Sequence, residues 1–357
     1  MLKQGVSEGK FRVKKYVFLM LAGILCFSST GCSLQHKDYY EKGMAKLEDN
    51  DYEKAEAYFN KAISEDQRLS ESYRGLGISL LKQGDNASAI AAFSRSLNEM
   101  EGSNKEFETD VMLYLAETRK DYGEYEEAVE IYTDLLKIEK NPEYYYLRGS
   151  LYLDLEEDDK AKEDFDAAVK DSRDYDMYVR ICNLYRSYNM NQEGESYLEL
   201  ALEVEPESAD DYNERGRVCY ELKDYAQAQE ELSKAINEGS TDAMLMLGKV
   251  YLEQNDSASA RSMYQDYLKS DEHKAKAYNG LAMCDIADKN YDSALDYIEQ
   301  GLAEDDSKEE QSLLYNEIVV YEYKEDFDTA KEKMEEYLKT YPDDEDAQRE
   351  NEFLSTR

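Results

Sequence analysis

The side chains that most often carry out catalysis or hold metal ions are scarce in this chain or lack the spacing that such chemistry needs. There are two histidines, His36 and His273, which are too few for a multi-histidine metal site. The sequence contains no GxxxxGK[ST], HExxH or GxSxG pattern. The acid-rich stretches 154–159 and 343–346 lack the glycine and the ligand spacing of an EF-hand loop. We therefore expect no enzyme activity, no bound metal and no cofactor.

The composition favours an elongated helical protein that does not bind nucleic acid. The chain has 357 residues, with 81 acidic and 43 basic side chains and a formal charge of −38. Such a charge repels a phosphate backbone. Three prolines argue against a turn-rich β-sandwich and for long helices. An apolar fraction of 41% is lean for one compact core, yet 12% aromatic residues are too many for a disordered chain.

The first 31 residues are typical of a secretory signal peptide. Residues 1–15 carry five bases and one acid, and an apolar run of twelve residues follows from Tyr16 to Phe27. That run is too short to span a bilayer as a helix. The next residues, Ser28 to Gly31, are small and precede Cys32. They resemble the lipobox of bacterial lipoproteins, although Ser29 stands where leucine is usual.

The lipobox resemblance implies a membrane anchor. Residues 1–31 would be removed, Cys32 would carry a diacylglyceryl group, and residues 32–35 would form a tether. The protein would then be exported and held at the outer face of the bacterial cell membrane, or at an outer membrane if the cell has one. The alternative is an ordinary signal peptide in which Cys32 has no special role.

The three cysteines in the rest of the chain predict no disulfide framework. Cys182, Cys219 and Cys284 are odd in number, and no CxxC pattern joins them. We expect them to be small buried hydrophobic residues. A bridge between Cys182 and Cys219 stays open as an alternative.

Small residues recur with a period near 34 residues beyond residue 36. One series, at steps of 32 to 39 residues, is Ala55, Ala89, Ala128, Ala161, Gly194, Ala228, Ala260, Ala294 and Ala330. Four residues after each lies a large apolar residue: Phe59, Phe93, Tyr132, Phe165, Leu198, Leu232, Tyr264, Ile298 and Met334. Twelve residues before each lies a second small residue, with Ile318 as the exception: Gly43, Gly77, Ala116, Gly149, Cys182, Gly216, Gly248 and Ala282.

This pattern resembles the tetratricopeptide repeat, a helix–turn–helix unit that stacks into a solenoid. Two helices approach closely only where both present small side chains, and larger residues then fill the volume towards the next repeat. The resemblance implies an all-α fold, a right-handed solenoid of about nine repeats over residues 36–344. The expected repeats are 36–69, 70–103, 109–141, 142–174, 175–208, 209–240, 241–274, 275–308 and 311–344. The fifth matches least well, because Gly194 replaces alanine, and the polar segment 345–357 is expected to form a capping helix.

Members of this family are protein-binding scaffolds whose stacked first helices form a concave groove. In the family, positions 2, 5, 9, 12 and 13 of the first helix face the groove. Carried onto this chain, those positions include Tyr40, Arg74, Tyr146, Asn183, Arg186, Asn213, Arg217, Tyr220, Asn279, Tyr315 and Tyr323. A tyrosine there suits peptide recognition, because a rigid ring carries a hydroxyl. The alternative is that these tyrosines are packing residues in a tyrosine-rich chain.

Asn183, Arg186, Asn213 and Arg217 fall on neighbouring repeats and could grip a peptide backbone or a carboxylate. Alternatively, the two arginines balance nearby acids. Some family members hold a terminal carboxylate with a set of lysine, asparagine and arginine residues. That set is not reproduced, because Val179 and Glu214 stand at two of its positions.

Together these features predict a membrane-anchored scaffold that binds a protein or peptide partner, in envelope or surface complex assembly. A factor associated with cell-wall polysaccharide or peptidoglycan is the alternative, since aromatic side chains also stack on sugars. A spacer that binds nothing is a third interpretation.

Overall fold

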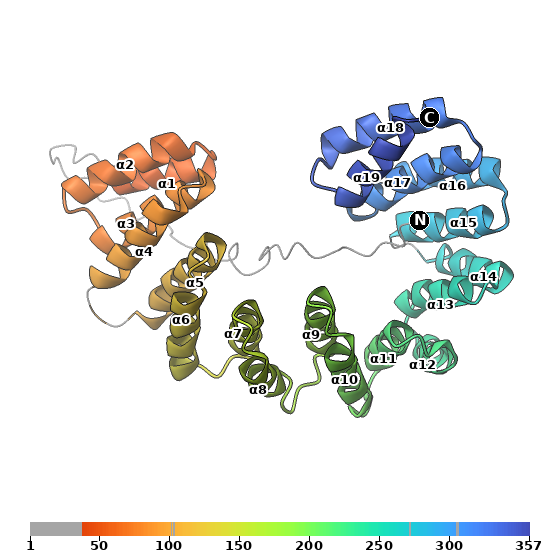
Figure 1. Ribbon diagram of the computed structural model, residues 1–357, viewed down its shortest axis with the longest axis horizontal. Coiled ribbons are helices and arrows are strands. Elements are labelled where there is room, and N and C mark those ends of the chain that lie inside the picture. Colours follow the sequence, from red (N-terminus) through yellow and green to blue (C-terminus); the bar gives the residue numbers. More distant parts are fainter. Residues whose placement is uncertain (1–37, 101, 103, 271–272, 305–306) are drawn as a thin grey trace, which may run out of the picture. The chain divides into compact units, whose positions relative to one another are not determined.

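The computed structural model describes residues 38–357 except 101, 103, 271–272 and 305–306. The predicted signal peptide, the proposed anchor Cys32 and the tether lie outside this range. The described residues form helices and turns without a strand, so the predicted all-α class is confirmed (Figure 1). The helices are α1 Tyr39–Glu48, α2 Tyr52–Ser64, α3 Leu69–Lys82, α4 Asn86–Asn98, α5 Lys105–Tyr122, α6 Tyr125–Ile138, α7 Pro142–Asp154, α8 Asp158–Ala168, α9 Tyr175–Ser187, α10 Asn191–Leu202, α11 Ala209–Glu221, α12 Tyr225–Asn237, α13 Asp242–Glu253, α14 Ser257–Tyr267, α15 Lys274–Ala287, α16 Tyr291–Leu302, α17 Ser307–Tyr323, α18 Phe327–Thr340 and α19 Glu345–Leu354.

The chain divides within α10 into two compact units, which we call the N-terminal unit (described over 38–194) and the C-terminal unit (195–357). In the N-terminal unit α1 packs on α2, α3 on α4, α5 on α6 and α7 on α8. The C-terminal unit repeats this order from α11 to α18, and α19 packs on α18. Each pair is one helix–turn–helix repeat, as the tetratricopeptide pattern predicts.

The small and large residues of the repeat meet as their spacing predicts. A Cβ added to Gly43 would lie 2.6 Å from Phe59 Cε1, and one added to Gly75 would lie 2.4 Å from Phe59 Cζ. The ring from a second helix therefore occupies a slot between two successive first helices, and glycine on both sides makes room for it. Tyr264 occupies the same kind of slot between Gly248 and Gly280, where the corresponding distances to its Cζ are 2.5 and 2.4 Å.

Gly194, the departure from alanine in the fifth repeat, has a packing reason. A Cβ at this position would lie 2.8 Å from the backbone oxygen of Cys182 on α9. The glycine therefore lets α10 approach the backbone of α9 more closely than a side chain would allow. Cys182 itself is buried at this contact, so both helices carry a small residue there, Cys182 on α9 and Gly194 on α10.

The cysteines behave as small buried hydrophobic residues. Cys182, Cys219 and Cys284 are fully buried, and Cys219 forms no disulfide, so the alternative bridge to Cys182 is not formed. Burial raises the pKa of the Cys219 and Cys284 thiols to about 12, which keeps both protonated and unreactive near neutral pH.

Every turn between the two helices of a repeat contains a residue with left-handed backbone geometry. In the described residues these are Asn50, Gly84, Gly123, Glu156, Asn189, Lys223, Asn255, Lys289 and Glu325, with φ between 56° and 89°. Each is the fifteenth residue of its predicted repeat. Only glycine and asparagine adopt this geometry readily, so the glutamate and lysine residues here are strained.

Three repeats replace an apolar pair between their two helices with an ion pair. The paired residues are sixteen positions apart: Arg148 with Asp164 at 2.7 Å, Arg215 with Glu231 at 3.4 Å, and Glu317 with Lys333 at 3.0 Å. The corresponding positions in the third repeat are Leu115 and Ile131. Because the ion pairs are at least partly buried, they fix the alignment of the two helices more than they add stability.

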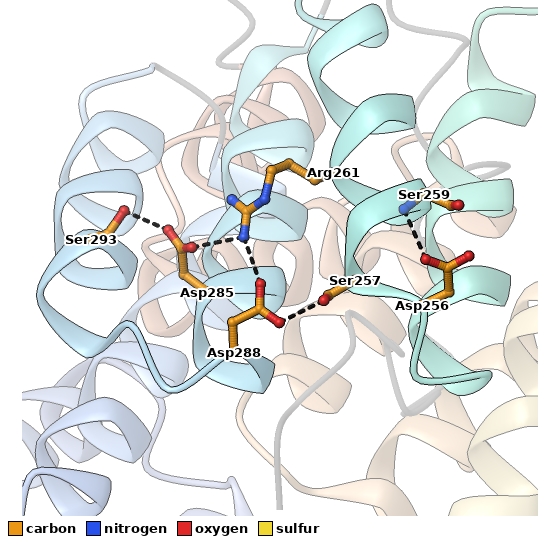
Figure 2. Close-up of polar contacts among 7 residues, drawn as sticks. All are labelled: Asp256, Ser257, Ser259, Arg261, Asp285, Asp288 and Ser293. Carbon is orange, nitrogen blue, oxygen red and sulfur yellow. Dashed lines mark hydrogen bonds and ion pairs between the residues drawn. The ribbon is translucent and has the colours of Figure 1, made fainter.

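A polar network joins the seventh and eighth predicted repeats within the C-terminal unit (Figure 2). Arg261 on α14 donates to Asp285 Oδ1 on α15 at 2.8 Å and to Asp288 Oδ2, at the C-cap of α15, at 3.1 Å. The Ser293 hydroxyl on α16 donates to the other oxygen of Asp285 at 2.5 Å. Asp285 is only 3% exposed, and a buried charge needs partners. Arg261 on α14 and Ser293 on α16 supply them.

Candidate partner-binding surface

We call the predicted groove-facing positions of the first helices the first-helix surface. It comprises positions 2, 5, 9, 12 and 13 of each repeat, on α1, α3, α5, α7 and α9 in the N-terminal unit and on α11, α13, α15 and α17 in the C-terminal unit. The two units are described separately below, because each has its own stack of first helices.

In the N-terminal unit, Tyr40 is contacted by an arginine at the N-cap of α3, and Arg74 is held by side chains of α5. The Arg68 guanidinium lies 4.7 Å from the centre of the Tyr40 ring. Arg74 donates to Asp110 on α5 and lies 5.4 Å from the centre of the Tyr114 ring. The contact of Arg74 with Tyr114 links the second and third repeats, and Tyr40 and Arg74 are both partly exposed.

Tyr146 is covered by an arginine of the following repeat. The Arg180 guanidinium on α9 lies 4.2 Å from the centre of the Tyr146 ring. The same guanidinium donates to both oxygens of Glu143 on α7, at 2.7 and 2.6 Å. Burial raises the pKa of Tyr146 to about 12 even though the Arg180 charge opposes this, so its hydroxyl stays protonated near neutral pH.

The four residues predicted as a polar peptide-gripping patch fall in two different units. Asn183 and Arg186 lie on α9 and share a hydrogen bond of 3.4 Å. Asn213 and Arg217 lie on α11, where Arg217 pairs with Glu214 at 3.0 Å. An acid on its own helix therefore balances Arg217, as the alternative interpretation expected. Asn213 Oδ1 is buried and accepts no hydrogen bond in the described residues.

In the C-terminal unit, Tyr220 and Tyr323 present partly exposed rings at the ends of their first helices. The Tyr220 hydroxyl donates to Glu253 on α13 at 3.3 Å, and its ring centre lies 5.9 Å from that of Tyr225. Tyr323 is 49% exposed, and its ring stacks on Tyr291 at 5.8 Å. The Tyr291 ring lies nearly parallel to that of Tyr323, at 10°, whereas the Tyr225 ring is tilted by 55° against that of Tyr220.

The structure corrects the prediction for three residues, because Tyr146, Asn279 and Tyr315 are buried. Their exposed fractions are 3, 3 and 4%. Asn279 on α15 donates to Glu309 at 2.7 Å and accepts from Asn316 at 2.8 Å, so its amide joins α15 to α17. Tyr146 and Asn279 contact neighbouring repeats, and Tyr315 packs on Tyr337 within its own repeat.

One residue that sequence reasoning did not select lies at a position of this surface, Lys249 on α13. Lys249 is at position 9 of its repeat, which is a groove-facing position, but a lone lysine in an acidic chain is expected to be paired. In the described ranges, no three His, Cys, Asp or Glu side chains gather into a metal-binding arrangement.

Comparison with known proteins identifies the family. Three family models, each described as a tetratricopeptide repeat, match residues 40–103 and 245–309, residues 80–151, and residues 142–170. Together they cover more than half of the chain, which belongs to the tetratricopeptide repeat family. The fold of such a protein is typically that of a non-enzymatic scaffold, and it is consistent with a role in protein–protein interaction.

One curated relative is similar over most of the described residues. It is a BBSome complex member BBS4 homolog from Drosophila melanogaster, 20% identical over 259 residues. The match covers 69% of this chain and 46% of the relative, so the chain spans about half the length of the curated relative that it matches.

Solved structures of the same family are similar at low identity. A tetratricopeptide repeat protein from Parabacteroides merdae is 19% identical, with 70% of this chain and 98% of that chain covered and a TM-score of 0.40. Yeast Tom70 is 17% identical, with 84 and 67% covered and a TM-score of 0.44. YrrB, described as a TPR protein with an unusual peptide-binding site, is 25% identical, with 53 and 97% covered and a TM-score of 0.34. Because these TM-scores are below 0.5, the family assignment rests on the family models and the helix packing.

Proposed function

We propose that this protein is a membrane-anchored scaffold that binds partner proteins or peptides on its first-helix surface, in the assembly of an envelope or surface complex. The observation that carries the proposal is that each unit has partly exposed, contact-fixed side chains on its own first helices, Tyr40 and Arg74 in the N-terminal unit and Tyr220 and Tyr323 in the C-terminal unit. Each is fixed by contacts with its neighbours, so a partner would meet a pre-organised surface.

The anchor is the second part of the proposal. Cys32, preceded by small residues and a short apolar run, supports lipidation and placement at the outer face of the bacterial membrane. Among the described helices, none combines the length and apolar character needed to cross a bilayer. Metabolic labelling with palmitate tests this part: the wild-type chain should be labelled and sediment with membranes, and Cys32→Ala should lose both. Equal membrane association of the two chains would contradict an anchor at this residue.

Purification from solubilised envelope tests the binding function. We expect one or more proteins to co-purify at fixed stoichiometry, and a variant with Tyr220→Ala and Arg74→Ala to retain less of them. Retention of wall fragments without a protein would instead support the second candidate function, association with polysaccharide. That candidate is favoured by the exposed tyrosine rings, Tyr122 at 53% and Tyr323 at 49%, because such faces also stack on sugars. A strain that lacks the protein and keeps unchanged membrane complexes would favour a spacer.

A further inference from the structure

The first repeat exposes a position that later repeats bury. Lys42 on α1 is the seventh residue of its predicted repeat and is exposed. The seventh residues of the third, seventh and eighth repeats are Leu115, Leu247 and Leu281, which are 6, 3 and 1% exposed. Their helices, α5, α13 and α15, pack on the second helix of the preceding repeat. In the described residues no repeat precedes α1, so no helix covers the equivalent face of α1 there (Figure 1).

Two lysines and two tyrosines gather on this face of the N-terminal unit. Lys42 Nζ lies 5.3 Å from the centre of the Tyr39 ring on the same helix. Lys61 Nζ, from α2, lies 5.9 Å from the centre of the Tyr39 ring and 5.6 Å from that of Tyr58. Both lysines are exposed, and both rings are partly exposed. We call these four residues the end-face patch, which joins α1 to α2 through cation–π contacts.

The two ammonium groups of the end-face patch have no anionic partner in the described part of the chain. Neither Lys42 nor Lys61 makes a hydrogen bond or an ion pair there. Lys46 on α1, in contrast, pairs with Asp49 at 2.6 Å. A polar end that serves solubility alone would be met equally well by acids, which outnumber bases 81 to 43 in this chain. Unpaired cations at this place therefore favour an anionic partner from outside the chain.

The acids that flank the end-face patch in the sequence are engaged elsewhere. Glu41 pairs with Arg68 at 2.9 Å. Glu65, four residues after Lys61, accepts a hydrogen bond from Gln67 Nε2 at 3.1 Å. The lysines of the patch thus keep their ammonium donors although the surrounding sequence is acidic.

We propose that the end-face patch binds the anionic phospholipid headgroups of the membrane that holds the lipid anchor. This inference deepens the proposed function and rests on its anchor at Cys32. Six residues separate Cys32 from Asp38, where the described chain begins. Six extended residues span at most about 20 Å, so a lipid on Cys32 would keep the first repeat beside the headgroups.

The chemistry of the end-face patch suits a phospholipid surface. Lysine ammonium groups are attracted to the phosphates of anionic lipids. A tyrosine ring places its apolar body towards the acyl chains and its hydroxyl among the headgroups. The same anionic surface repels the rest of the chain, whose formal charge is −38 in total. Membrane contact is therefore favoured at the end-face patch and opposed elsewhere on the protein.

Fluorescence quenching tests the docking, because the chain contains no tryptophan and a single one can be introduced. The lipidated protein with Tyr39→Trp is purified from membranes and reconstituted into vesicles of phosphatidylglycerol and phosphatidylcholine. A nitroxide on part of the phosphatidylcholine headgroups quenches a tryptophan that lies among them. We expect about twofold quenching. The quenching should be lost when Lys42→Gln and Lys61→Gln are added, or when phosphatidylglycerol is left out.

Tyr145→Trp is the matched control. Tyr145 on α7 occupies the same repeat position as Tyr39, and Lys140 lies 5.8 Å from the centre of its ring. Unlike Tyr39, it packs against a core cluster that includes Leu135 and Leu136 of α6. Its tryptophan variant should show no quenching. All variants should keep the circular dichroism spectrum of the wild type, because the changed lysines are exposed.

Three results would overturn the docking: no quenching of Tyr39→Trp, equal quenching after both lysines are replaced, or equal quenching in phosphatidylcholine alone. Quenching that appears only together with cross-links between copies would show that the end-face patch binds a second copy instead. If any of these occurs while Cys32→Ala still abolishes palmitate labelling, the docking is wrong and the anchor stands. If Cys32→Ala keeps the membrane association of the wild type, the anchor fails and the docking fails with it.

Discussion

At the residue scale, arginines decide which tyrosines of the first-helix surface remain exposed. Tyr40 and Tyr146 occupy the same repeat position, yet Tyr146 is buried beneath Arg180, whose guanidinium also grips Glu143. Tyr40 keeps a partly exposed ring beside Arg68. Identical positions in a repeat thus present different chemistry, because the covering residue belongs to another repeat.

The contact of Arg180 with Tyr146 and Glu143 can be tested by truncation. Arg180→Ala leaves Glu143 without its bidentate partner and uncovers the Tyr146 ring. We expect the free energy of unfolding to fall by about 1–2 kcal/mol. Urea denaturation measures this, and Arg95→Ala, an exposed arginine on α4, serves as the control. Equal effects of the two variants would show that the bidentate contact contributes no stability.

The glycine slots predict a second residue-scale result. Gly43→Ala places a methyl group 2.6 Å from Phe59 and should destabilise the protein by about 1–3 kcal/mol through overpacking. Adding Phe59→Leu to Gly43→Ala should recover part of this loss, because the smaller side chain leaves room for the methyl. Thermal melts of the single and double variants would show it. If the double variant loses more stability than the two single variants lose together, the close contact between residue 43 and Phe59 is contradicted.

At the element scale, the turn between the two helices stores strain where glutamate or lysine adopts left-handed geometry. Glu325 has a φ of 59°, a conformation that asparagine tolerates far better. Glu325→Asn should therefore raise stability by about 0.5–1 kcal/mol. The reciprocal change, Asn255→Ala at the equivalent turn, should lower it. Differential scanning calorimetry of both variants checks the pair, and shifts in the same direction would count against strain at this position.

The contact between α17 and the terminal helix α19 should depend on pH. Burial and the Glu350 carboxylate raise the pKa of Glu322 to about 7, above the ordinary value near 4.3. At a pH between these two pKa values, Glu322 is therefore protonated in the folded state and deprotonated in the unfolded state. By linkage, this contribution to stability is fully present below about pH 4 and is lost as pH rises through 7.

Because Glu322 is only half-buried, solvent screening reduces the effect to about 1 kcal/mol. Glu322→Gln should raise the melting temperature at pH 8 and flatten its dependence between pH 5 and 8. Glu336→Gln on α18, at an exposed position, should leave that dependence as in the wild type. A wild-type melting temperature that rises from pH 5 to pH 8 while that of Glu322→Gln stays level would contradict the shift.

Much of the element-scale structure follows from the sequence, because helix packing links residue size to spacing. Phe59 four residues after Ala55, and Gly43 twelve before it, meet in one slot, so the repeat and its helices were predictable. The exposed side chains of the first-helix surface were less predictable. Whether a tyrosine is covered depends on a long side chain from the next repeat, as with Arg180. Lys249 was missed because the spacing of residues does not indicate whether a charge has a partner.

At the scale of the whole molecule, the acidic excess is a property of the surface more than of one site. Acids cap second helices, as Asp256 does by accepting from the Ser259 backbone N–H at 3.0 Å (Figure 2). Others join repeats, as Asp285 and Asp110 do. A formal charge of −38 also favours solubility and discourages self-association. Partner recognition is therefore expected where cations and aromatic rings interrupt the acids.

The most direct test of the account is site-specific photo-crosslinking in cells. A photoreactive phenylalanine analogue replaces Tyr220 or Tyr323 on the first helices, or, as the matched control, Tyr297 on the second helix α16. The account predicts a defined cross-linked protein from Tyr220, from Tyr323 or from both, and none from Tyr297. Cross-links from Tyr297 alone, or none from any position in a strain that makes the protein at its normal level, would contradict binding on the first-helix surface.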